Sequence, residues 1–148
     1  MSKLIFLIVL LTLLHGSCSK SDNGDESAII EYEMACGRCS GTTSLVIRGG
    51  DASYLKTIPC GTNKSTISKN LNLRAIEWEN LLKSFNHSQF LKLSVNECGV
   101  CFDGCDERLK ITREGIVHEI RFLPANTPAE TESLVYHLKE VIQQFEKP

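Results

Sequence analysis

The chain has 148 residues, of which 42% are hydrophobic and 23% charged, an ordinary composition for a single globular domain. Its 16 basic and 18 acidic residues give a formal net charge of -2 without any basic stripe, which argues against nucleic-acid binding. The 7 cysteines are many for this length, and they are the most informative feature of the sequence.

The N-terminus is predicted to be a secretory signal peptide over residues 1–17. Lys3 supplies a short positive region, and residues 4–14 form an apolar run that only Thr12 interrupts. As a helix this run spans about 16 Å, well short of a bilayer core. A buried core helix is the alternative, but the run has no polar face.

The apolar run ends at Gly16-Ser17-Cys18. Small residues directly before a cysteine resemble the lipobox of bacterial lipoproteins, which implies that Cys18 is lipidated and becomes the first residue of the mature chain. His15 stands where that family usually has Leu, a departure that the relaxed lipoboxes of Bacteroidetes-type bacteria tolerate. The expected location is therefore the cell envelope, as an outer-membrane or cell-surface lipoprotein. The alternative is ordinary cleavage beside Ser17, which would give a secreted protein.

Residues 18–27 are polar and acidic, and we expect a flexible tether there. The pattern changes at Ala28, so residues 28–148 are predicted to form a single α+β domain. The expected partners are the membrane, through the lipid anchor, and a protein that the sequence does not identify; no nucleic acid is expected.

Setting Cys18 aside leaves an even number of cysteines, which in an exported domain indicates disulfide bonds. They are Cys36, Cys39, Cys60, Cys98, Cys101 and Cys105. Sequence alone does not choose among their possible connectivities.

Two thiol-dependent alternatives remain open. Cys36, Cys39, Cys98 and Cys101 form two Cys-x-x-Cys pairs, which together resemble the ligand set of a tetrahedral zinc site. Either pair is also compatible with redox exchange, but that chemistry needs a lowered thiol pKa. Neither motif is followed by a helical pattern, and Asp103 and Asp106 would raise a nearby thiol pKa.

The first half of the domain is predicted to contain strands and then one helix. Alternation and turn residues place strands at residues 28–34, 42–48, 53–58 and 65–68. Apolar residues at helical spacing then predict a helix over residues 73–85, with Asn72 as its cap and Trp78 packed in the core.

The second half repeats this order. Residues 107–113 and 116–123 are predicted to form a hairpin around the turn Glu114-Gly115. Thr127, Pro128 and Glu130 have the spacing of a capped helix start, and an apolar stripe continues from there to the C-terminus.

The expected fold is therefore α+β, an antiparallel sheet of two hairpin units with two helices packed on one face. The sequence resembles small uncharacterised lipoproteins of Bacteroidetes-type bacteria, which carry a short cysteine motif before a first hairpin and end in a hairpin followed by a helix. That resemblance implies no particular activity.

No catalytic motif is evident in the sequence. It lacks a His-Glu-x-x-His zinc motif, a Gly-x-Ser-x-Gly elbow and a phosphate-binding glycine loop. His118 shares strand parity with Ile116 and Ile120, so we expect it to be a half-buried packing residue. Whether the protein is an enzyme stays open; the prediction is a non-catalytic domain with an interaction or structural role and without a cofactor.

Overall fold

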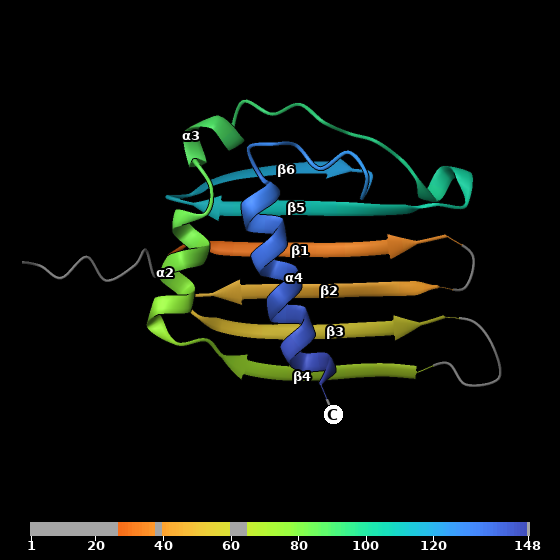
Figure 1. The fold of residues 1–148 in the computed structure, drawn as a ribbon, viewed down its shortest axis with the longest axis horizontal. Helices are drawn as coiled ribbons and strands as arrows, with labels where there is room; N and C mark the ends of the chain where they lie inside the picture. Colours follow the sequence, from red (N-terminus) through yellow and green to blue (C-terminus); the bar gives the residue numbers. More distant parts are fainter. Residues whose placement is uncertain (1–26, 38–39, 60–64, 148) are drawn as a thin grey trace, which may run out of the picture.

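A computed structural model describes residues 27–37, 40–59 and 65–147. Its described strands form one antiparallel sheet in the order β4-β3-β2-β1-β5-β6 (Figure 1). The elements, in chain order, are β1 (Ile29–Cys36), β2 (Gly41–Arg48), β3 (Asp51–Ile58), β4 (Ser65–Asn72), α2 (Ala75–Lys83), α3 (His87–Phe90), η2 (Val100–Phe102), β5 (Cys105–Arg113), β6 (Ile116–Phe122) and α4 (Glu132–Glu146). The α+β class and the antiparallel sheet are thus confirmed.

Along most of β1 and β2, buried residues alternate with partly exposed ones, so one face of the sheet faces the core. β1 lies inside the sheet and pairs along its whole length with both β2 and β5. The β2–β3 and β5–β6 hairpins consequently lie on opposite sides of β1.

The helices contribute the other half of the core. α4 crosses in front of the strands and α2 lies beside it in the view of Figure 1. The side chains of Leu134, Leu138 and Val141 on α4 are buried in the same cluster as Tyr32 and Leu109 of the sheet. Trp78 is 4% exposed, in agreement with its predicted place in the core.

The structure corrects both predicted helix starts. Residue 72 ends β4 instead of capping a helix, and α2 begins at Ala75 after Arg74. The Arg74 amide donates to the Glu77 carboxylate at 2.8 Å, so the cap lies two residues later than predicted. Residues 127–131 form a turn in which the Thr131 amide donates to the Pro128 carbonyl, and α4 begins only at Glu132.

The strand predicted at residues 65–68 is also longer than expected. β4 continues to Asn72 and pairs residue by residue with β3, from Ser65 opposite Ile58 to Asn72 opposite Asp51. All of its residues are exposed except the half-buried Leu71, so burial leaves no alternation in its sequence.

Candidate functional site

The described cysteines gather at one end of the sheet, on the right in Figure 1. Cys36 at the end of β1 lies directly opposite Cys105 at the start of β5, and the two form a disulfide with a Cα–Cα distance of 4.0 Å. Cys98 and Cys101 form a second disulfide within the loop that leads into β5. Cys18, Cys39 and Cys60 lie outside the described residues.

The loop around the second disulfide is closed by backbone contacts and one buried carboxylate. Asp106 is 5% exposed, and its Oδ1 accepts hydrogen bonds from the amides of Gly99 and Val100. A Cβ on Gly99 would lie 2.4 Å from the Cys105 carbonyl oxygen, so only glycine fits there. On this tied loop the Phe102 ring is 86% exposed.

This geometry does not favour a thiolate at the second Cys-x-x-Cys. A low-pKa cysteine needs free amide groups or a cation beside its sulfur. Here the amides that follow Cys98 already bind the Asp106 carboxylate, whose negative charge opposes a second anion.

The four cysteines of the alternative zinc site do not come together as thiolates in the described residues. Cys36 is bonded to Cys105, Cys98 is bonded to Cys101, and Cys39 lies outside the described part. Zinc binding requires thiolates, so this alternative requires reduction of both disulfides. Residues 27–37, 40–59 and 65–147 contain no group of three or more metal-ligating side chains.

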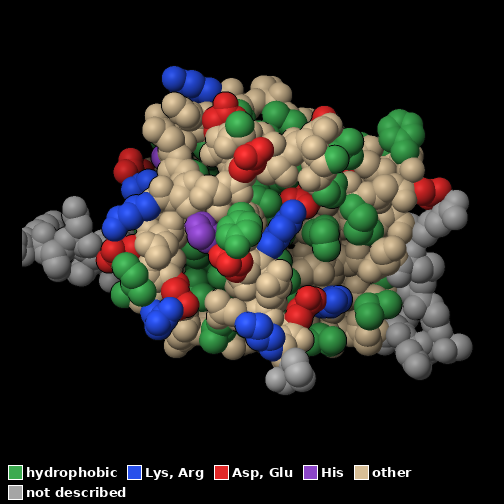
Figure 2. All heavy atoms as spheres, in the orientation of Figure 1, with side chains coloured by type: hydrophobic (Ala, Val, Ile, Leu, Met, Phe, Trp, Pro, Cys, Tyr) green, Lys and Arg blue, Asp and Glu red, His purple; other side chains and the backbone are tan. Residues whose placement is uncertain are grey.

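A cavity of about 390 Å³ opens between α4 and the cysteine-bearing end of β1–β3. Its lining includes Tyr32, Met34, Lys56, Lys139 and Ile142. Figure 2 shows hydrophobic side chains reaching the surface on this face beside α4. The cavity therefore combines apolar walls with lysine side chains.

A buried polar group lies beneath this cavity. Glu107 is fully buried, and its Oε1 binds the Lys139 ammonium at 2.7 Å. Its Oε2 and the Tyr32 hydroxyl have no hydrogen-bond partner among the described residues. Burial, and then the nearby Glu107 carboxylate, raise the pKa of Tyr32, which keeps the hydroxyl protonated. Both unpartnered atoms are sealed from solvent, so neither presents a group to the cavity opening.

The rim of the cavity is also neutralised. Glu146 Oε1 binds the Lys56 ammonium at 2.8 Å and accepts from the Tyr54 hydroxyl at 3.0 Å. Hydrogen bonds from Lys56 and then Tyr54 lower the pKa of Glu146. Both lysines at the cavity therefore already have carboxylate partners, and the pocket offers no uncompensated charge to a ligand.

Two of the described histidines, His118 and His137, have polar contacts within the fold. His118 Nε2 lies 3.0 Å from the Leu93 carbonyl oxygen, and its ring meets Phe90 edge to face at 5.0 Å. This is the half-buried packing position that strand parity predicts for His118. His137 lies 2.9 Å from the Glu140 carboxylate on the exposed side of α4.

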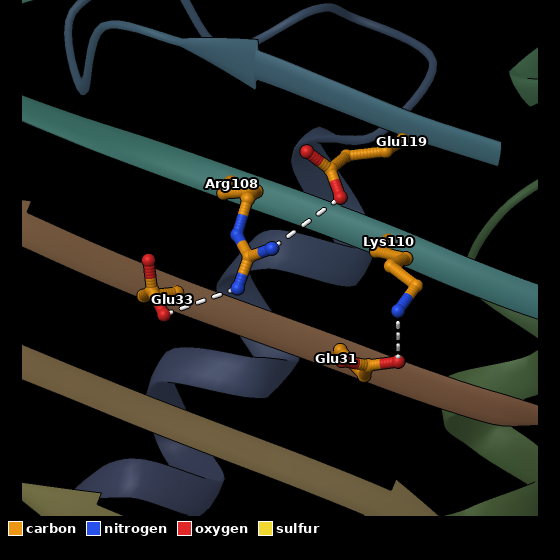
Figure 3. A network of polar contacts seen from close by, with 5 residues as sticks. All are labelled: Glu31, Glu33, Arg108, Lys110 and Glu119. Carbon is orange, nitrogen blue, oxygen red and sulfur yellow. Dashed lines mark hydrogen bonds and ion pairs between the residues drawn. The ribbon is translucent and has the colours of Figure 1, made fainter.

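The face of the sheet away from the helices has two unlike halves. On β1, β5 and β6, Arg108 lies between Glu33 at 3.1 Å and Glu119 at 3.4 Å, and Lys110 pairs with Glu31 at 2.8 Å (Figure 3). On β2, β3 and β4 the middle of this face carries hydroxyl, amide and aliphatic side chains without charge. The three cross-strand rows there are Thr42-Thr57-Thr66, Ser44-Leu55-Ser68 and Val46-Ser53-Asn70.

The two edges of the sheet also differ, in this case in how far their backbone groups are paired. Residues 95–97 cover the β6 edge near its C-terminal end, at Arg121. The Arg121 amide donates to the Val95 carbonyl, and the Arg121 carbonyl accepts from the Glu97 amide at 2.9 Å. Glu97 also accepts from the Leu123 amide at 2.8 Å. In the described part of the chain, no segment pairs with the outer edge of β4.

Comparison with known proteins adds no relative. No protein-family model matches the sequence, and no curated protein matches it. None of the described helices is long and apolar enough to cross a membrane.

Proposed function

We propose that the protein is an exported, lipid-anchored and disulfide-stapled domain whose role is interaction or structure rather than catalysis. The anchor is Cys18, released from the signal peptide of residues 1–17 and joined to the domain by the tether of residues 18–27. The location is the cell envelope, on the outer membrane or the cell surface. The domain consists of two hairpin units whose helices pack on one face of the sheet.

The observation that carries this proposal is the disulfide between Cys36 and Cys105. It joins two neighbouring strands across 69 residues of chain, and closing a loop of that length stabilises a domain by about 4 kcal/mol in the chain-entropy model. Such a bond persists in an oxidising space outside the cytoplasm. The neutralised cavity and the packed histidines, among the described residues, supply no nucleophile with an adjacent base.

The anchor is tested by intact mass and N-terminal peptide mapping of the protein isolated from its own membranes. We expect a chain that begins at Cys18 with acyl groups, because more than one acyl chain is needed for stable anchoring. An unmodified chain beginning at Lys20 would support secretion and contradict the anchor.

The staple is tested by thiol titration of the denatured mature protein, with and without reductant. We expect no titratable thiol at Cys36, Cys98, Cys101 or Cys105 before reduction, and a lower melting temperature after it. Free thiols together with bound zinc would favour the thiol-dependent alternative instead.

A further inference from the structure

Strand β4 is an edge strand with little of the usual protection of an edge. Natural sheets protect their edges with short strands, proline, bulges, covering segments or charged side chains, lysine above all. β4 has 8 residues, contains no proline, and pairs one to one with β3 without a bulge. Its one protecting charge is Lys69, which turns its ammonium back to the Phe145 carbonyl of α4. Within residues 27–37, 40–59 and 65–147 no strand pairs with the outer backbone groups of β4, so they are open to pairing there.

We propose that this edge is an interaction surface for a second copy of the chain, and that two β4 strands pair antiparallel around a two-fold axis. Two identical edge strands form a closed, self-complementary contact only in this way. The proposal rests on the interaction role given above and names the partner. The uncharged half of the open face continues to this edge, so no like charges on it oppose the approach of a second copy.

The charge on β4 selects the register. A two-fold axis at Lys69 would place two ammonium groups opposite each other, which is unfavourable. An axis at Ser68 pairs Ile67 with the partner's Lys69 and Thr66 with the partner's Asn70. It keeps nearly the whole strand in the pair. The charge pattern therefore places Ser68 at the axis.

Membrane anchoring favours such a contact. A single strand pair is a small interface, and small interfaces are weak in free solution. Two chains tethered to one membrane meet at a raised effective concentration, so a weak contact becomes populated. The mature protein in its own membrane is therefore the right sample.

The register is tested by oxidative crosslinking of Ser68→Cys in membranes, read on a non-reducing gel. At the axis the two Cα atoms lie about 4.5–5.5 Å apart, within the range of a disulfide. The matched control is Asn70→Cys on the same face, where the two copies of the residue are about 14 Å apart. We expect a covalent dimer from Ser68→Cys, and none from Asn70→Cys or the wild type.

Two lysine variants test the contact without any new cysteine. Ser68→Lys places like charges across the axis and is expected to weaken self-association about fivefold or more, measured by energy transfer between fluorescently labelled chains in the same membranes. Ser53→Lys is the matched control, since Ser53 is an exposed serine on the same face but one strand inward. Equal melting temperatures of the two variants show that the fold is kept.

Three results of these experiments, and a fourth from hydrogen exchange, would each overturn the proposal. The first three are absence of the Ser68→Cys dimer, equal crosslinking of Ser68→Cys and Asn70→Cys, and equal association of the two lysine variants. Protection of β4 amides from hydrogen exchange in a chain that remains single would also overturn it, because a different partner would then cover the edge. None of these results alters the N-terminal mass or the thiol titration, so the anchor and the staple are judged separately.

Discussion

The β5–β6 side and the β3–β4 side of the sheet differ in their cross-links, their surface charge and the pairing of their outer edges. On the β5–β6 side a disulfide joins β5 to β1, residues 95–97 pair with the outer edge at Arg121, and ion pairs link the strands across the open face. On the β3–β4 side the open face is largely uncharged, and no described residue pairs with the outer edge. The first side is cross-linked and partly covered, while the second keeps the hydrogen-bonding groups of its edge available.

One sheet can therefore have a partly covered edge at β6 and, at β4, an edge that is available to a partner. An uncovered edge risks uncontrolled pairing, so it is tolerated where a partner occupies it. The segment of residues 95–97 obstructs pairing at Arg121 on the other edge, whereas no described residue pairs with the outer side of β4, which makes β4 the less hindered edge.

The largest expected effect is loss of the staple on the β5 side. Replacing Cys36 and Cys105 together by alanine is expected to lower the free energy of unfolding by about 4 kcal/mol, measured by urea denaturation. The matched control replaces Cys98 and Cys101, whose loop spans 3 residues and should contribute only about 2 kcal/mol. Equal losses in the two double variants would contradict this account of the staple.

The buried ion pair between β5 and α4 should come next. Lys139→Met leaves the fully buried Glu107 carboxylate without its cation, and we expect a loss of about 2 kcal/mol, since the lysine itself is partly solvated. Changing both residues to methionine removes the charge as well and should recover most of the stability. A double variant as unstable as Lys139→Met would show that packing, and not the unpaired charge, causes the loss.

Uncovering the β6 edge should have a smaller effect. Glu97→Ala removes the acceptor of the Leu123 amide and is expected to cost about 1 kcal/mol. Hydrogen exchange at Arg121 and Leu123 should accelerate while exchange in β4 stays the same. Glu130→Ala, at an exposed glutamate in the turn before α4, is the control that should change neither.

The last effect leaves stability at neutral pH unchanged and is confined to alkaline pH, on the β3 side. Burial, and then the hydrogen bond to Glu146, raise the pKa of Tyr54 to about 12. Because this pKa lies above the unfolded value of about 10, the tyrosine's contribution is complete below pH 10 and is lost as the pH rises through 12. Between pH 10 and pH 12 the free energy of unfolding should therefore fall less for Tyr54→Phe than for the wild type. Urea unfolding at several pH values measures this difference. Parallel pH curves for the two proteins would contradict the shift.

Much of the fold was predictable because burial leaves a period of two in the central strands. Ile30 and Tyr32 alternate with Glu31 and Glu33, and the structure buries the first pair and leaves the second partly exposed. Only the first half of β4 was predicted, because an edge strand that is exposed on both faces has no alternation of buried and exposed residues. The helix at the C-terminus was predicted to start too early, because Thr127 and Pro128 suit a turn as well as a cap.

The candidate site was less predictable because its parts come from distant segments. The Cys36–Cys105 pair follows from the adjacency of β1 and β5, which no local pattern specifies. Glu107 shares the parity of Leu109 and Ile111, a signal that it points inward, but its partner Lys139 lies on another element. Whether an edge is covered depends on where the loop of residues 95–97 passes, and the sequence carries no period for that.

The interior position of β1 has a mechanical consequence for the proposed anchored protein. A pull transmitted through the tether would enter the domain at the start of β1, parallel to its ladders with β2 and β5. Such a load shears both ladders at once instead of unzipping them bond by bond. The Cys36–Cys105 bond at the far end of the strand would then keep β1 from sliding past β5 under tension.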